Sequence, residues 1–318
     1  MRYEGSNKLG RSRSARWLPT WNVSGAWNMH EESFFESLRP SLSNFTLKAS
    51  YSLTADRGPA NVTNSLAVIM GYNPWRPLSS VNESGLQITD LENSELTYEK
   101  KHELNIGAEV GFLENRINLA GDWYKRNNYD LIGLINTMGV GGQVSKLDIV
   151  ASMESHGVEF TLSTRNISTK NFKWTTDFIF SNAKNKVTEL KSDANVMSMI
   201  SGSGFAAEGN PVRALYSLNF QGLNKEGLPT FINEKGELTV TDINFQEREN
   251  KSHLVYEGST DPTITGCFGN IFSYKGFKLN VFMTYSFGNV IRLDPVFHNA
   301  YSDLDATPRE FKNRWTVA

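Results

Sequence analysis

The sequence has 318 residues, a formal net charge of −2 and a mean hydropathy of −0.40, and 39% of its residues are hydrophobic. No run approaches the roughly 18 apolar residues of a transmembrane helix. The single cysteine, Cys267, excludes an intrachain disulfide and a cysteine-based zinc cluster. The charge gives no basic surplus, and we expect no nucleic-acid partner.

Alternation of apolar and polar residues with period two recurs along the whole chain. Trp21, Val23 and Trp27 fall at alternate positions early in the chain, and the pattern is strictest in 277–287. This alternation predicts β-strands with one apolar and one polar face. We predict nine long strands, at about 1–6, 17–28, 44–53, 102–112, 115–126, 157–165, 172–182, 263–274 and 277–290.

The length of the last two runs separates a membrane barrel from a soluble sandwich. A soluble strand usually has about five or six residues, whereas a tilted membrane-spanning strand needs about nine to eleven. We therefore predict an all-β, antiparallel transmembrane β-barrel. The alternation places the side chain of Cys267 on the inward-facing side of its strand. Outward positions are Leu104, Val110, Leu119, Trp123, Val281 and Tyr285, and lumenal positions are Glu103, Glu109, Asp122, Lys278 and Asn280.

The lengths of the links support this topology, because outer-membrane barrels have short periplasmic turns and long external loops. The links after residues 28, 112, 165 and 274 are short or moderate, and those after 53, 126, 182 and 290 are long. The alternation requires that Val212–Phe220 is not a spanning strand. We predict that 183–262 is one large external loop with hairpins of its own.

The polar residues do not form an enzyme-like pattern, and we expect no catalytic residue, cofactor or metal. The histidines lack metal-ligand spacing such as His-x-x-x-His. They are His30, His102, His156, His253 and His298.

Two stretches, 91–132 and 256–289, resemble the C-terminal part of the barrel of SusC/RagA-type TonB-linked outer-membrane transporters. Tyr98 stands where that family prefers Trp, and the opening RYEGSNKLG and the strand start Gly157-Val158-Glu159 are also similar. The positions that match the family's loop, turn and strand motifs are Asn93, Leu96, Glu99, Asn105, Gly107, Asn115, Arg116, Tyr124 and Lys125.

The resemblance implies that residues 1–318 form about nine strands of a 22-strand barrel with long extracellular loops. The family's signal peptide, TonB box, plug and final strands would lie outside this chain. The opening MRYEGSNKLGRSRS has no apolar signal-peptide core, so we expect a fragment or an excised domain. The implied activity is TonB-dependent import of oligosaccharides or peptides through the outer membrane, with a SusD-like lipoprotein over the mouth.

The external loops hold aromatic and amide side chains that suit stacking on sugars and hydrogen bonding to them. The alternative is that these side chains pack the loops or contact the lipoprotein. The candidate ligand contacts are Tyr72, Asn73, Trp75, Tyr216, Asn219 and Gln221.

Two other functions remain open. A TonB-dependent receptor for siderophore or cobalamin keeps the fold and has no lipoprotein lid. A secreted β-sandwich module that binds carbohydrate would form two stacked sheets, and the strand length argues against it. A neighbouring gene for a SusD-like protein would separate the importer from the siderophore receptor.

Overall fold

The computed structural model describes residues 2–5, 17–39, 41–58, 67–73, 84–93, 96–139, 144–191, 194–202, 204–293, 309 and 312. The chain divides into two compact units. The first holds residues 1–192, 208–210 and 263–287, and the second holds 193–207, 211–262 and 288–318. Among the described residues, no helix is both long and apolar enough to cross a membrane.

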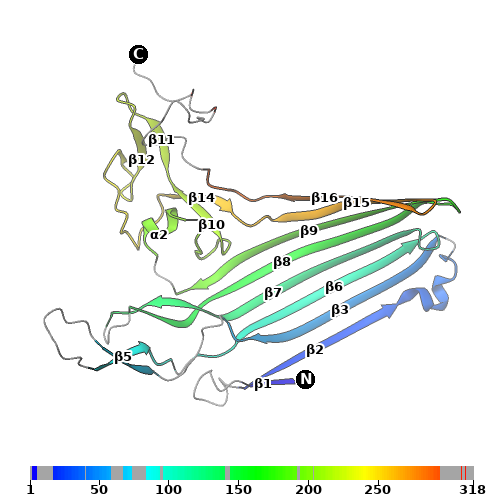
Figure 1. The fold of residues 1–318 in the computed structure, drawn as a ribbon, viewed down its shortest axis with the longest axis horizontal. Helices are drawn as coiled ribbons and strands as arrows, with labels where there is room; N and C mark the ends of the chain where they lie inside the picture. The colour runs from blue at the N-terminus through cyan, green and yellow to red at the C-terminus, as the bar shows by residue number, and fades with distance from the viewer. Residues whose placement is uncertain are drawn as a thin grey trace. The chain divides into compact units, whose positions relative to one another are not determined.

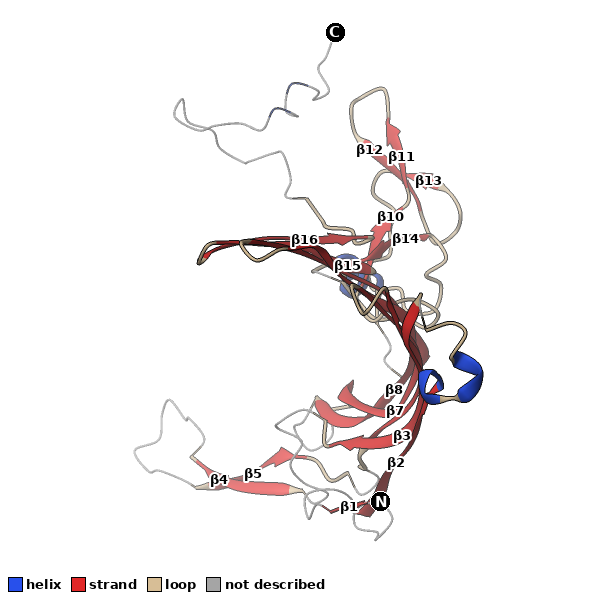
Figure 2. Ribbon diagram, turned by 90° about the vertical axis from the view of Figure 1, so that its right-hand side faces the viewer, coloured by secondary structure: helices blue, strands red, loops and turns tan. Residues whose placement is uncertain are grey.

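The first unit is dominated by one continuous antiparallel sheet, and the described residues contribute nine strands to it (Figure 1). Figure 2 shows that this sheet is curved. The predicted barrel wall is confirmed, and one continuous sheet replaces the two stacked sheets of the sandwich alternative. In sheet order the strands are β1 (Arg2–Gly5), β2 (Trp17–Asn28), β3 (Leu42–Asp56), β6 (Glu99–Phe112), β7 (Ile117–Asn136), β8 (Ser145–Ser168), β9 (Phe172–Leu190), β15 (Ile264–Tyr274) and β16 (Phe277–Phe287).

The register of the strands separates two faces, because residues directly opposite each other in an antiparallel pair share a face. Ile106 lies opposite Trp123, which lies opposite Val158, and the same face continues to Phe287. The predicted outward and lumenal sets therefore lie on opposite faces, as the alternation indicates. We call them the apolar face, with Leu104, Val110, Leu119, Trp123, Val281 and Tyr285, and the polar face, with Glu103, Glu109, Asp122, Cys267, Lys278 and Asn280.

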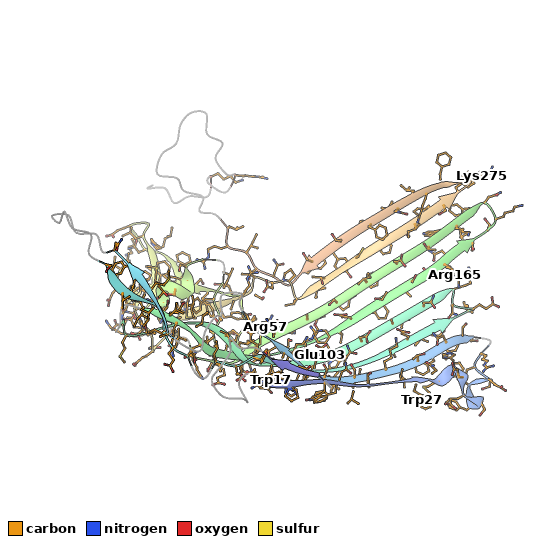
Figure 3. The ribbon with its side chains drawn as sticks, turned by 60° about the horizontal axis from the view of Figure 1, so that its bottom comes forward. Trp17, Trp27, Arg57, Glu103, Arg165 and Lys275 are labelled. Carbon is orange, nitrogen blue, oxygen red and sulfur yellow. The ribbon has the colours of Figure 1, made fainter. Side chains whose placement is uncertain are left out.

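Short links join the strands at one end of the sheet, where Trp27, Arg165 and Lys275 lie (Figure 3). In the link between β6 and β7, Leu113, Glu114 and Asn115 all have positive φ, at 51°, 56° and 57°. Arg165 holds this strained turn, since its guanidinium donates to the carbonyls of Glu114 at 2.9 Å and Asn115 at 2.7 Å. A long charged side chain thus stabilises a backbone that non-glycine residues rarely adopt.

Three strands run further than the sequence predicts at the opposite end. We expected β7 to stop near residue 126, β8 to start near 157 and β9 to stop near 182, but all three continue beyond those points. The link between β7 and β8 is therefore a long extended hairpin. The external loop after β9 was predicted to begin at residue 183, but β9 continues to Leu190. Two hydrogen bonds of 2.9 Å also join the backbone of Val187 to Gly209 and Asn210, so this part of the predicted loop is bound to the end of the strand.

The second unit is a folded loop with a small core of its own. Helix α2 (Val196–Ile200) and strand β10 (Ala214–Leu218) bury Val196, Met199, Ala214 and Tyr216. Strand β10 pairs with β14 (Leu254–Ser259), so Val212–Phe220 is not a spanning strand, as predicted. The remaining short strands are β11 (Phe220–Leu223), β12 (Pro229–Ile232) and β13 (Leu238–Thr239), and β4 (Val68–Tyr72) pairs with β5 (Gly85–Asp90) in the first unit.

Candidate functional site

The first group of candidate ligand contacts lies at the end of a two-stranded hairpin. Tyr72 ends β4 and is 47% exposed, and Asn73 follows it on the surface. Trp75 lies outside the described residues. Tyr72 and Asn73 are therefore both accessible to a ligand.

The second group is split by burial within the folded loop. Tyr216 is 4% exposed and packs with Ala214 and Met199, so its ring is covered. Gln221 is exposed, and its amide donates to the side-chain oxygen of Asn219 at 2.7 Å. Only the amide pair presents polar groups at the surface.

Two turns of the same design project from the second unit. The side-chain oxygen of Asn224 accepts from the N–H groups of Glu226 at 3.0 Å and Leu228 at 2.9 Å. Asn233 repeats this pattern with Lys235 and Glu237, at 3.0 and 2.9 Å. Each asparagine thus replaces lost backbone partners and stiffens a tight hairpin. Among the described residues, no group of three or more His, Cys, Asp or Glu side chains is arranged to hold a metal ion.

Hydrogen bonds also fix the segment that leads back to β14. The N–H groups of Asn250 and Glu249 donate to the carboxylate of Glu247 and hold its pKa below the usual range. The backbone carbonyl of Glu247 in turn accepts from Val196 at the start of α2, at 3.0 Å. The external loop is therefore a defined surface.

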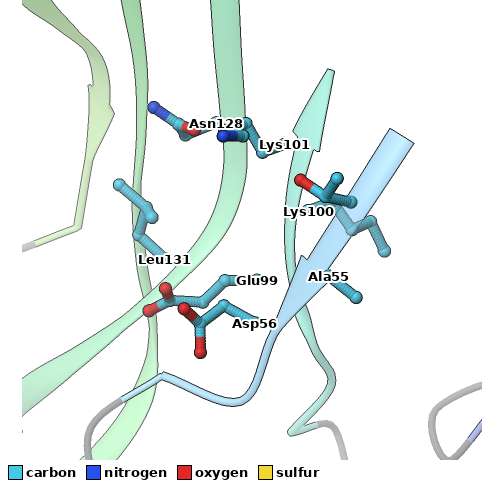
Figure 4. Close-up of a pocket in the computed structure, with 8 residues that line it drawn as sticks. Ala55, Asp56, Glu99, Lys100, Lys101, Asn128 and Leu131 are labelled. Carbon is cyan, nitrogen blue, oxygen red and sulfur yellow. The ribbon is translucent and has the colours of Figure 1, made fainter. Parts of the chain in front are cut away.

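A pocket lies on the sheet at the end opposite the short turns, between β3, β6 and β7 (Figure 4). Asp56 and Glu99 lie directly opposite each other, and Figure 4 shows their carboxylates reaching toward the same space. Lys100 pairs with Asp130 at 2.5 Å. Carboxylate, ammonium and amide groups here suit a polar ligand. The lining residues are Thr54, Ala55, Asp56, Glu99, Lys100, Lys101, Asn128 and Leu131.

Sequence reasoning missed this pocket. Asp56 and Glu99 fall just outside the predicted strands, where alternation no longer marks which face a residue takes. The available signal was the cluster of charged residues in 99–103, directly before a membrane-length strand.

The segment that enters β6 is anchored beside this pocket. Asn93 donates to the carbonyl of Leu147 at 2.8 Å and to Asp148 at 3.2 Å. Leu96 and Tyr98 are almost fully buried and pack with Ile132, whose N–H donates to Glu99 at 2.9 Å. The motif residues in 93–99 therefore tie this segment to the extended hairpin of β7 and β8.

We predict that Asn93→Ala loosens this segment, because the substitution leaves the carbonyl of Leu147 without its amide donor. Loss of such a bond costs about 1–3 kcal/mol. Limited proteolysis should therefore cut 84–98 about tenfold faster or more, since cleavage follows the population of the open form. Asn73→Ala, at an exposed position, is the matched control. Equal cleavage rates for N93A and the unaltered protein would contradict the anchoring role.

No family model matches the chain. TonB-dependent receptor P3 of Formosa agariphila is 25% identical over 306 residues, which cover 91% of this chain and 30% of that receptor. TonB-dependent receptor SusC of Bacteroides thetaiotaomicron is 26% identical over 202 residues, 60% of this chain and 19% of SusC. The RagAB peptide importer in its closed-closed state has the same fold, with a TM-score of 0.71, 22% identity, and coverage of 90% of this chain and 31% of that chain.

In sequence and in fold, the chain is similar to SusC/RagA-type TonB-dependent receptors. It spans about 30% of the length of receptor P3 and about 19% of the length of SusC. The suggested resemblance of the two stretches is thus confirmed over most of the chain. In this receptor segment the curved sheet is part of the barrel wall, and its apolar face is the lipid-facing one.

Proposed function

We propose that this receptor segment supplies wall and external loops to an outer-membrane transporter that imports oligosaccharides or peptides. Energy would reach the transporter through TonB, and a SusD-like surface lipoprotein would cover its external mouth. The observation that carries the proposal is the curved sheet of membrane-length strands, with short links at one end and a pocket at the other.

The pocket beside Asp56 and Glu99 is the proposed contact for polar groups of the cargo. Its ammonium and carboxylate groups suit the ends and side chains of peptides as well as sugar hydroxyls. Tyr72, Asn73, Trp75, Asn219 and Gln221 remain proposed loop contacts. For Tyr216 we propose packing of the loop, because its ring is buried.

Co-purification tests the proposed lipoprotein partner and separates this function from siderophore uptake. An affinity-tagged receptor that carries these strands, extracted from outer membranes in mild detergent, should retain a SusD-like lipoprotein. Disruption of the receptor gene should abolish growth on one oligosaccharide or peptide as sole nutrient. Loss of growth only under iron or cobalamin limitation, with no lipoprotein retained, would establish the siderophore or cobalamin alternative instead.

A further inference from the structure

A row of basic side chains interrupts the apolar face where the membrane-spanning part of the sheet ends. Lys125 on β7 lies directly opposite His156 on β8, which lies directly opposite Lys184 on β9. Lys186 is the next residue of β9 on the same face. All four side chains are exposed.

This row lies at the outer edge of the lipid-facing band. On the same face, the next residue toward the short turns is Trp123 on β7 and Val158 on β8. On β9 the next residue is Asn182, and Phe180 comes after it. Short turns mark the periplasmic end of an outer-membrane barrel, so the row lies near the extracellular leaflet. Long basic side chains at this depth place their charges among lipid headgroups.

Aromatic residues on the neighbouring strands also indicate that this end of the apolar face lies at the membrane interface. On the same face, Trp21, Tyr51, His102 and Tyr129 form a chain of ring contacts, with centroid distances of 5.4, 6.1 and 5.9 Å. The hydroxyl of Tyr51 lies 3.2 Å from Nδ1 of His102. Amphipathic rings of this kind gather at the membrane interface.

Protein groups balance only part of the charge of the row. Glu154 on β8 lies 3.9 Å from Lys125 and directly opposite Lys186 in the register, but within the described part of the chain Lys184 and Lys186 make no ion pair. One carboxylate thus faces three lysines. On the polar face, by contrast, Arg126 pairs with Glu103 at 3.1 Å. Like charges on adjacent strands repel, and an external anion would relieve this repulsion.

We propose that Lys125, His156, Lys184 and Lys186 bind the phosphate groups of an anionic lipid of the outer leaflet. The acyl chains of this lipid lie along the apolar side chains below the row, on Trp123, Val158 and Phe180. The lysines supply charge, and the imidazole of His156 supplies a hydrogen bond between them. The site is independent of the cargo, because it lies on the face opposite Glu103 and Asp122.

Native mass spectrometry of a detergent-purified receptor that carries these strands tests the site. The probes are diphosphoryl lipid A, dioleoylphosphatidylcholine and inorganic phosphate. The triple variant K125Q/K184Q/K186Q should bind diphosphoryl lipid A on the order of 100-fold more weakly, since each basic residue contributes several-fold to binding of an anionic surface. The corresponding Lys→Arg triple variant should retain binding.

The matched control is K170Q/K173Q/K278Q, which removes three exposed lysines at the short-turn end, outside the apolar face. It should bind diphosphoryl lipid A normally, and heat-modifiable migration on a gel should show that all variants are folded. Unchanged binding by K125Q/K184Q/K186Q, or equal loss in the control, would overturn the site. Equal binding of phosphatidylcholine would overturn the role of phosphate charge, and displacement by inorganic phosphate at equal concentration would overturn the role of the acyl chains.

Discussion

Replacement of residues 219–253 by an Asn-Gly turn is expected to abolish nutrient uptake while the barrel still folds. Leu218 at the end of β10 lies directly opposite Leu254 at the start of β14, so a two-residue turn can close the hairpin without distortion. The core residues Ala214, Tyr216 and Met199 all remain. The deletion keeps these core residues, but it removes the carbonyls of Phe245 and Glu247 that accept hydrogen bonds from the start of α2.

The reason to expect loss of uptake is that hydrogen bonds fix the conformation of this part of the loop. The two asparagine turns and the hydrogen bonds from 245–247 to α2 give it a fixed surface, which suits recognition of a cargo or a lipoprotein better than a flexible loop would. Growth on the nutrient that depends on the receptor should fall to the level of the gene disruption.

Two controls make the result interpretable. Heat-modifiable migration should match that of the unaltered receptor, and K225A/E226A, at the exposed tip of one turn, should support normal growth. Normal growth with the confirmed deletion would remove this loop from transport. Loss of the folded barrel would show that 219–253 belongs to the wall.

The wall of the barrel could be predicted from the sequence because membrane strands leave a local signal. Each residue between the short turn and the outer leaflet faces either lipid or the channel. Apolar and polar residues therefore alternate throughout 102–112 and 277–287. The two predicted faces of the strands followed from that signal, and the lengths of the links supported the topology.

The strand extensions and the pocket were missed because the signal ends where lipid ends. Beyond the membrane both faces of a strand meet water or protein, and a bulge in β7 between Asn128 and Ile132 shifts the register with β8. Asp130 there has a φ of 59°. Such a bulge reverses which face the following residues take, so Leu131–Ile135 shows no regular alternation and was not predicted as part of the strand.

The burial of Tyr216 could not be predicted for a related reason. An aromatic residue in a long link is consistent both with ligand stacking and with packing of a loop core. Only the pairing of β10 with β14, residues that lie far apart in the sequence, decides which one the chain forms. The exposed candidates Tyr72 and Gln221 carry the same ambiguity in sequence, and the structure places both at the surface.

Gly157→Leu is expected to prevent assembly of the barrel. A Cβ atom at Gly157 would lie 2.6 Å from the carbonyl oxygen of Asn182 on β9 and 2.6 Å from the hydroxyl of Tyr124 on β7. Asn182 pairs with Val158 in the ladder, so its backbone cannot move without loss of the register. The side chain of Tyr124 is 5% exposed, and the guanidinium of Arg126 covers its ring at 4.1 Å.

The cost of this overpacking is about 3 kcal/mol or more, because two strands would have to separate to relieve it. Gly121→Leu is the matched control. Gly121 lies two residues from Trp123 on the apolar face of β7, and no atom lies within 4 Å of its ideal Cβ. A leucine at position 121 faces lipid and should be tolerated. Heat-modifiable migration after outer-membrane extraction should therefore be lost for G157L and retained for G121L. A folded G157L barrel would contradict the close approach of Tyr124 and Asn182 to Gly157.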